Sequence, residues 1–451
     1  MEEILNIQKP IIFDESVAHY ELHTHLPYGA SKFNNSDEIR IGVQHQDLCL
    51  LPSKSSLHIT GKFTKSNGNA VAATTSLVKM SIAHMFEEIR YEINGIEVDR
   101  SKNVGLTTLM KGYVSFNPNQ KAFLENAGWI NDEKIFDNEG NFNISIPLSI
   151  LLGFAEDYRK IIINAKHELI IVRSNTDTNA YKQTTVADAA AENVKISLEK
   201  IEWIVPYIRV SDKQKIQLLN FIAKDPSIAM SFRTWELYDY PLLPATTKHI
   251  WSVKTSTQLE KPRYVIVGFQ TARKNVANKD ASLFDHCKMR DIKLFLNSQS
   301  YPYGNLNINI TQNQYALLYD MFAQFQVSYY GKESEPLLTK KEYIDQAPLI
   351  VIDCSKQNEF LKSGPVDIRL EFESFEQFPA ETSAYCLILH DRIVDGNSSS
   401  RSSGMQYESK VEKESRKNYF EISKSLRGSE PYYGYVKQGK YGSVGDHRPK
   451  Y

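Results

Sequence analysis

The eight residues Val366-Asp367-Ile368-Arg369-Leu370-Glu371-Phe372-Glu373 decide the fold, because apolar and charged side chains alternate through them without interruption. A period of two places Val366, Ile368, Leu370 and Phe372 on one face of a strand and the charges on the other. A helix would spread the same residues around its whole circumference. The stretch therefore predicts a β-strand with one face in a core and one face in water.

Two shorter apolar runs flank this strand. Residues 349–352 and residues 385–389 are almost entirely apolar, which is typical of strands buried in a sandwich of sheets. Turn residues separate the three runs, with Gly364-Pro365 before the alternating strand and Pro379 after it. We expect the three strands to form one antiparallel sheet.

Length and composition bound the class of protein. A chain of 451 residues exceeds what one core comfortably holds, so two domains are expected. The formal net charge of -1 argues against general binding of polyanions. No run approaches the roughly 20 apolar residues that span a bilayer. The acidic start, residues 1–4, lacks the basic and apolar regions of a secretion signal.

Strand signals recur in the first half of the chain. Apolar residues alternate with other residues over 39–43 and 57–63. Asn94-Gly95 stands between two alternating runs and predicts a hairpin, because both residues tolerate positive φ. The apolar phase shifts between Leu198 and Ile201, which predicts a β-bulge in a further strand.

Helices are expected at three places in this part of the chain. The first covers residues 104–112, and the second covers 148–158 with Pro147 at a first-turn position. The third begins at the capping box Ser211-Asp212-Lys213-Gln214 and ends near Pro226. We interpret it as the connector between two halves.

The second half resumes the strand pattern. Further strands are expected at residues 230–238, 249–254, 264–269, 292–296 and 306–310. Aromatic and apolar side chains then recur at helical spacing from Tyr315 to Phe325. They predict one long amphipathic helix with a buried stripe and no obvious counterpart in the first half.

About eight short strands in each half are what a jelly roll requires. We therefore predict an all-β protein of two tandem jelly-roll β-sandwiches, a double jelly roll with short helical insertions. The expected boundaries are an N-terminal arm at 1–32, the first jelly roll at 33–208, a connector helix at 209–228, the second jelly roll at 229–395 and a C-terminal tail at 396–451.

The tail differs in composition from the rest of the chain. Its Ser- and Gly-rich start, residues 396–404, cannot bury enough apolar surface to fold, so we predict a flexible segment. Residues 396–451 contain 11 Lys and Arg, 6 Asp and Glu, and 7 Tyr. The tail is therefore basic and rich in Tyr.

His19, His23 and His25 are the best candidates for metal ligands, because His23 and His25 share one face of a strand. Cupins also use a His-x-His pair, but a Glu follows it a few residues later. Residues 26–29 read Leu-Pro-Tyr-Gly at that place. We expect solvated histidines and no metal.

The four cysteines are far apart in the sequence and form no C-x-x-C pair, so we expect reduced thiols in the core. They are Cys49, Cys287, Cys354 and Cys386. A nucleophilic Cys354 with His286 or His390 as its base is formally possible, but no local signature supports it. We interpret Cys354 as a buried structural thiol.

Two other motifs carry little weight. Residues 434–440 match the first seven positions of a phosphate-binding loop, but Tyr441 replaces the Mg²⁺-binding hydroxyl and no apolar strand precedes them. Paired carboxylates occur at Glu87 and Glu88 and at Glu371 and Glu373. We expect the carboxylates to be solvated, and we assign no catalytic, cofactor or metal site and no nucleic-acid contact residue.

Several segments resemble the double jelly-roll major capsid proteins, in particular those of Maverick/Polinton-type elements and adintoviruses. The resemblance spans residues 30–395 and is stronger in the second half. The segments that carry it are residues 233–238 (RTWELY), 261–270 (KPRYVIVGFQ), 294–298 (LFLNS), 301–303 (YPY) and 360–369 (FLKSGPVDIR), with 146–149 (IPLS) and 152–154 (LGF) in the first half.

The resemblance implies a structural protein rather than an enzyme. Three chains would form a homotrimeric, hexon-like capsomer of an icosahedral capsid around double-stranded DNA. It also implies penton and minor capsid proteins as partners, no small-molecule substrate, and a virion protein made in the cytoplasm or nucleus of a host cell. The basic tail is expected to contact packaged DNA, with the capsid interior or a partner protein as open alternatives. The competing hypothesis is a carbohydrate-binding or enzymatic double β-sandwich, which would need an aromatic platform or a carboxylate pair in a cleft.

Overall fold

The computed structural model describes residues 17–29, 32–44, 49–129, 135–163, 165–184, 191–222, 228–254, 262–356 and 366–395. The predicted tail at 396–451 lies outside the described residues, and so does the motif at 434–440.

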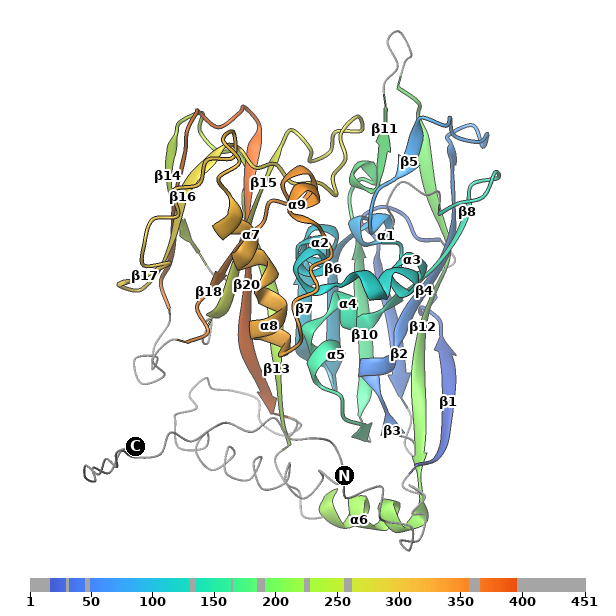
Figure 1. Ribbon diagram of the computed structural model, residues 1–451. Coiled ribbons are helices and arrows are strands. Elements are labelled where there is room, and N and C mark those ends of the chain that lie inside the picture. Colours follow the sequence, from blue (N-terminus) through green and yellow to red (C-terminus); the bar gives the residue numbers. More distant parts are fainter. Residues whose placement is uncertain are drawn as a thin grey trace, which may run out of the picture. The chain divides into compact units, whose positions relative to one another are not determined.

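The first half of the chain forms a sandwich of two antiparallel sheets (Figure 1). One sheet has the order β1 (Val17–His25), β12 (Val194–Val210), β4 (Ser56–Lys65) and β8 (Asn141–Pro147). The other has the order β2 (Glu38–Gln44), β10 (Lys166–Arg173), β6 (Phe86–Ile93) and β7 (Ile96–Lys102). Short strands add to this part: β3 (Cys49–Leu50) and β9 (Ile162–Ile163) extend the first sheet, and β5 (Thr75–Leu77) pairs with β11 (Tyr181–Gln183). Tyr91 and Trp203 meet between the main sheets with ring centroids 6.0 Å apart.

The second half forms a sandwich of the same kind. One sheet has the order β13 (Ala229–Tyr240), β20 (Thr382–Asp395), β15 (Pro262–Thr271) and β18 (Ile350–Asp353). The other has the order β14 (Lys248–Val253), β19 (Ile368–Ser374), β16 (Met289–Leu296) and β17 (Gln299–Tyr301). Phe269 and Phe372 pack between the two sheets with ring centroids 5.3 Å apart.

The two sandwiches share one strand order. We count the main strands of each half from first to eighth, which are β1, β2, β4, β6, β7, β8, β10 and β12 in the first half and β13 to β20 in the second. In both halves one sheet runs first-eighth-third-sixth and the other runs second-seventh-fourth-fifth. This order is that of a jelly roll, so the predicted double jelly roll is confirmed.

Strand β1 lies within residues 1–32, where the sequence predicts an N-terminal arm. It is nevertheless the first strand of the first roll and pairs with β12 along its length. The sequence pattern does not reveal β1 because its first six residues are exposed on both faces, so no apolar alternation marks it. The first roll therefore begins before residue 33.

Residues 368–373 of the alternating stretch lie in β19, in which buried and half-buried residues alternate as predicted. The prediction that it shares a sheet with its two neighbours is wrong. β18 and β20 both pair with β15, whereas β19 pairs with β14 and β16. Consecutive strands at this end of a jelly roll alternate between the two sheets, and no local pattern records that alternation.

Two local predictions in the first roll are confirmed. Asn94 and Gly95 connect β6 to β7 with φ angles of 53° and 78°, as a tight hairpin requires. The pairing of β12 with β4 shifts register between Leu198 and Lys200, which is the predicted bulge.

The helices depart further from expectation. The predicted helix at 104–112 is α2 (Val104–Ser115). The helix predicted at 148–158 is divided into α4 (Leu148–Leu151) and α5 (Gly153–Asp157), because Leu152 is extended. The expected connector contains α6 (Asp212–Ile222). Among the residues of this half that the structure describes, the other short helical segments are α1 (Ser81–His84), α3 (Lys121–Asn126) and the 3-10 turns Pro52–Lys54, Pro118–Gln120 and Thr178–Ala180.

The helix predicted from Tyr315 to Phe325 is two helices, α7 (Ala316–Ala323) and α8 (Phe325–Tyr330), with Gln324 between them. A third helix, α9 (Lys340–Gln346), follows a capping box at Thr339. The prediction that this insertion has no counterpart is wrong, since α2 and α7 both follow the fifth strand of their rolls. The prediction of a strand at 306–310 is also wrong. Asn307 has a φ of 48°, and within this segment only Asn309 forms a β-bridge, which is isolated. No helix in the described part of the chain is long and apolar enough to cross a membrane.

Candidate functional site

The two rolls meet where β13, the first strand of the second roll, lies beside β7, the fifth strand of the first. Asp99 of β7 accepts a hydrogen bond from the hydroxyl of Thr234 at 2.5 Å and another from the backbone N–H of Phe154 at 2.9 Å. Burial raises the pKa of the Asp99 carboxyl, and these hydrogen bonds oppose the rise. Because an unpaired buried carboxylate is costly, Asp99 favours one register of β7, α5 and β13.

Arg233 of β13 makes a second contact between the rolls. Its Nε and Nη2 atoms donate to the two carboxylate oxygens of Asp157 at 2.7 and 2.6 Å, and its backbone N–H donates to Asp157 at 2.9 Å. The guanidinium also lies 3.8 Å from the centre of the Tyr329 ring. Such a planar, bidentate pair is directional as well as charged. At Gly153 an added Cβ would lie 2.0 Å from the carbonyl oxygen of Arg233, so only glycine allows this approach.

Lys111 of α2 is buried close to the same contact. Its Nζ donates to the carbonyl of Ser149 and pairs with Glu156, both at 2.7 Å, and it lies 5.4 Å from the centre of the Trp235 ring. Glu156 in turn accepts from the hydroxyl of Tyr330 at 2.6 Å. These contacts connect α2 and α5 of the first roll with β13 and α8 of the second.

Further hydrogen bonds cross between the rolls away from this centre. Three of them are Tyr113 to the carbonyl of Ser282 at 3.0 Å, Gln326 to the carbonyl of Phe116 at 2.9 Å and Lys79 to Gln346 at 2.6 Å. Phe154 and Phe232 add an apolar contact with ring centroids 5.1 Å apart. The rolls are thus held in one relative orientation by many directional contacts.

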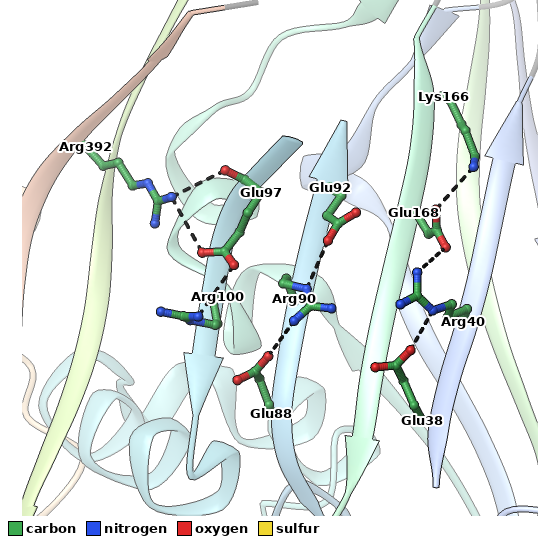
Figure 2. A network of polar contacts seen from close by, with 10 residues as sticks. All are labelled: Glu38, Arg40, Glu88, Arg90, Glu92, Glu97, Arg100, Lys166, Glu168 and Arg392. Atoms are coloured by element: carbon green, nitrogen blue, oxygen red, sulfur yellow. Dashed lines mark hydrogen bonds and ion pairs between the residues drawn. The ribbon is translucent and has the colours of Figure 1, made fainter. Parts of the chain in front are cut away.

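A belt of charged side chains crosses the outer face of the sheet β2-β10-β6-β7 and reaches Arg392 of β20 (Figure 2). Each strand of the sheet contributes both carboxylates and cations to it, and most of the ion pairs join residues of one strand. Arg90 pairs with Glu88 and Glu92, both at 3.0 Å, and Arg40 pairs with Glu38 at 2.6 Å and Glu168 at 3.2 Å. The belt ends in the pairs Lys166–Glu168, Arg100–Glu97 and Arg392–Glu97.

The belt neutralises itself, since the ten residues of Figure 2 comprise five carboxylates and five cations. Ile170 stands directly between Arg40 and Arg90 in the sheet and is fully buried, which indicates that the aliphatic parts of long side chains cover it. The belt therefore offers no net positive field to a polyanion.

The histidines of β1 are engaged with their neighbours. Glu21 contacts His19 at 2.5 Å and His23 at 2.8 Å, and these hydrogen bonds, with His23 the larger cause, lower the pKa of Glu21. The Tyr207 hydroxyl lies 3.0 Å from Nε2 of His25. Among the residues that the structure describes, no group of three or more His, Cys, Asp or Glu could hold a metal ion.

The predicted thiol and carboxylate candidates are dispersed. Cys354 is buried and donates to the carbonyl of Pro262, whereas His390 pairs with Glu236 and His286 accepts from the backbone N–H of Lys288. All four cysteines are free, and burial raises the pKa of the Cys287 thiol to about 12 and raises that of Cys386. Three of the four carboxylates that the sequence places in exposed pairs form ion pairs. These are Glu88 with Arg90, Glu371 with Arg369 and Glu373 with Arg290.

A cleft of about 470 Å³ opens between β7 and the strands β13 and β14. Trp251 and three carboxylates, Glu87, Glu236 and Asp239, line it. The Tyr238 hydroxyl donates to Glu236 at 2.5 Å, and Asp239 lies 3.8 Å from Lys274. The cleft thus contains the residue types that sugar binding needs, but Glu236 and Asp239 already contact neighbouring groups.

The contacts between the rolls are the functional feature that the sequence does not predict. Asp99, Asp157 and Arg233 have no distinctive spacing, because their partners are far away in the chain. Of these residues, only Lys111 is recognisable in the sequence, because it is the single charged residue within the apolar segment 109–114. Such a charge inside an apolar helix face indicates a buried pair, although its partner is set by the tertiary structure.

Residues 75–394 match the family described as the double jelly roll-like domain. The chain belongs to this family. The match covers most of both rolls of the double jelly-roll protein. No curated protein matches it.

Solved structures share the fold of this double jelly-roll protein at low sequence identity. The Sputnik virophage structure is 12% identical with a TM-score of 0.60, covering 90% of this chain and 92% of that chain. The PBCV-1 virus capsid is 9% identical with a TM-score of 0.54, covering 86% and 97%. The mavirus major capsid protein is 11% identical with a TM-score of 0.51, covering 90% and 96%. At these identities the likeness shows the fold.

Proposed function

We propose that this double jelly-roll protein is the major capsid protein of a double-stranded DNA virus, a virophage, or a virus-like element of the Maverick/Polinton or adintovirus type. It is a structural protein, and no enzymatic role is proposed. The observation that carries the proposal is the fixed pairing of two complete jelly rolls within one chain. One roll closes its own core and could fold alone. The second roll beside it is therefore explained by a function of the pair and not by the stability of either roll.

Covering a surface with repeating units explains why one chain contains two rolls. Three two-lobed chains related by cyclic symmetry make a ring of six lobes, which packs with near-hexagonal contacts. The buried contact at Asp99 and the half-buried contact at Arg233 keep the lobes in register, as a repeating lattice requires. The solved structures named as capsids, which have this fold over most of their length, support the same proposal.

The proposed partners follow from this role. The chain associates with itself as a homotrimer and then as an icosahedral lattice in the virion, with penton and minor capsid proteins at special positions. The basic tail at 396–451 contacts packaged DNA or the inner capsid surface. Synthesis takes place in the host cell, in the cytoplasm or nucleus.

Light scattering of the purified protein tests the proposal. Three chains of 51.6 kDa give a mass of about 155 kDa, and electron microscopy should show hexagonal capsomers or closed particles. A glycan array addresses the competing hypothesis at the cleft beside Trp251. A strictly monomeric protein that forms no particle and binds glycans would replace the capsid role with carbohydrate binding.

A further inference from the structure

A polar pocket of about 430 Å³ lies between the two rolls. The first roll lines it with α1, the beginning of α2 and the end of β10, and the second roll lines it with β15, the loop after β15, and β20. Asn179 and Asn275 join its two sides, because the Asn179 amide donates to the Asn275 side chain at 2.9 Å and the Asn275 backbone N–H donates to Asn179 at 2.6 Å. The pocket is therefore held open in one shape, and its size is that of a small-molecule site.

Two buried side chains in the wall of this pocket carry polar atoms with no hydrogen-bond partner among the residues that the structure describes. They are Nε2 of His84, a residue that is 7% exposed, and Nε of Arg173, which is 2% exposed. A buried polar atom without a partner costs free energy, so a ligand that bonds it gains affinity. Burial lowers the pKa of His84 to about 4, so its imidazole is neutral at pH 7 and its Nε2 donates or accepts according to the tautomer.

The charges that line the pocket leave little for an ionic ligand to pair with. Arg173 pairs with Asp177 at 2.9 Å, and Lys274 lies 3.8 Å from Asp239. Glu87, the carboxylate in the lining, is exposed. Half of the lining residues carry uncharged amides or hydroxyls instead. Such a lining suits an uncharged ligand rich in hydroxyl groups, whereas an ion would lose its hydration without gaining a counter-charge.

We infer that this pocket binds a neutral mono- or disaccharide. Sugar hydroxyls both donate and accept, so they match the imidazole of His84 and the N–H of Arg173 on the side of the first roll. On the side of the second roll they meet Gln270 and Tyr385, which are 3% and 1% exposed. The inference goes beyond the proposed function, because a capsid lattice needs no ligand pocket. Sugar binding would attach such a particle to glycosylated surfaces.

Saturation-transfer NMR of the purified full-length chain tests the inference with a panel of neutral mono- and disaccharides, and with sialic acid and glucose 6-phosphate as charged comparisons. We expect neutral sugars to bind and the charged ones not to bind. His84→Phe keeps a ring of similar size but removes the imidazole nitrogens, so it should weaken binding about tenfold. Asn175→Trp places a large ring at an exposed position of the lining and should block the pocket.

Two further variants locate the bound sugar. Asn138→Trp is the matched control, since Asn138 is exposed in the first roll and does not line the pocket. Trp251→Ala separates the pocket from the adjoining cleft, which shares Glu87 with it. Both should bind sugar as wild type does, and a cooperative thermal melting transition confirms that each variant is folded. The inference is overturned if no neutral sugar binds, or if Trp251→Ala abolishes binding that His84→Phe and Asn175→Trp retain.

The capsid role and the sugar site fail in different ways. Trimers or particles that bind no neutral sugar would overturn the sugar site and leave the capsid role. A strictly monomeric protein whose sugar binding is lost in Asn175→Trp would support the sugar site and remove the capsid role.

Discussion

Arg233 and Asp157 join the two jelly rolls by a bidentate ion pair, with N–O distances of 2.6 and 2.7 Å. Arg233 comes from the first strand of the second roll, and Asp157 comes from the end of α5 in the first. Because their side chains are only 28% and 14% exposed, removing one partner leaves a poorly solvated charge.

We expect Arg233→Ala to lower the free energy of unfolding by roughly 2 kcal/mol, with Arg233→Lys intermediate because it loses the planar fork. Arg290→Ala is the control, since Arg290 and Glu373 are 50% and 37% exposed and such pairs contribute about 0–1 kcal/mol. Urea denaturation followed by tryptophan fluorescence provides the measurement. If Arg233→Ala and Arg290→Ala lowered the free energy of unfolding equally, the ion pair between the rolls would contribute no more than an exposed ion pair.

A methyl group at Gly153 should separate the rolls locally. The added Cβ would lie 2.0 Å from the Arg233 carbonyl, which is too close for any side chain. We expect Gly153→Ala to destabilise the protein by about 1–3 kcal/mol through this overlap. Gly304→Ala is the matched change at a position with no atom within 4 Å of the added Cβ. Thermal melting of the two variants compares them directly, and a Gly153→Ala protein as stable as Gly304→Ala would contradict the close approach.

Buried histidines should make the fold sensitive to mild acid. Burial lowers the pKa of His167 to about 4, and its Nδ1 atom lies 2.5 Å from the hydroxyl of Tyr91. As pH falls below about 6.5, the unfolded chain gains a proton on this imidazole while the folded protein does not until about pH 4. The stability from neutral His167 is therefore complete above pH 6.5 and is lost progressively towards pH 4, by roughly 3 kcal/mol in all. Burial also lowers the pKa of His84 to about 4, so His84 adds to the loss of stability in acid.

Urea midpoints at pH 7.5 and pH 5 measure this loss. His167→Gln should reduce the difference between the two midpoints, whereas Tyr91→Phe should lower both midpoints and keep the difference. A His167→Gln protein with the full wild-type pH dependence would exclude His167 as a cause.

The tail should be dispensable for folding, because its Ser- and Gly-rich start has no apolar periodicity. Truncation after Asp395 is expected to leave the melting temperature unchanged and to remove DNA retention that weakens with rising salt. A truncated chain that melts several degrees lower would show that the tail is part of the fold. DNA retention that does not depend on salt would contradict an electrostatic contact.

The sequence by itself determined the class of fold and most of the strands. Alternation at 366–373, the Asn94-Gly95 turn and the phase shift after Leu198 are local patterns, and each reports its structure because burial on one face repeats every second residue. The number of strands expected in each half then led to the prediction of two jelly rolls.

Only the tertiary structure decided which strands share a sheet, that β1 completes the first roll, and where the rolls touch. β1 shows no alternation because both its faces are exposed in a single chain, so its place depends on pairing with β12, far away in the sequence. The contacts of Asp99 with Thr234 and of Asp157 with Arg233 likewise join residues that are 135 and 76 positions apart. No local period encodes such pairs, because their energy arises only when folding removes both partners from water.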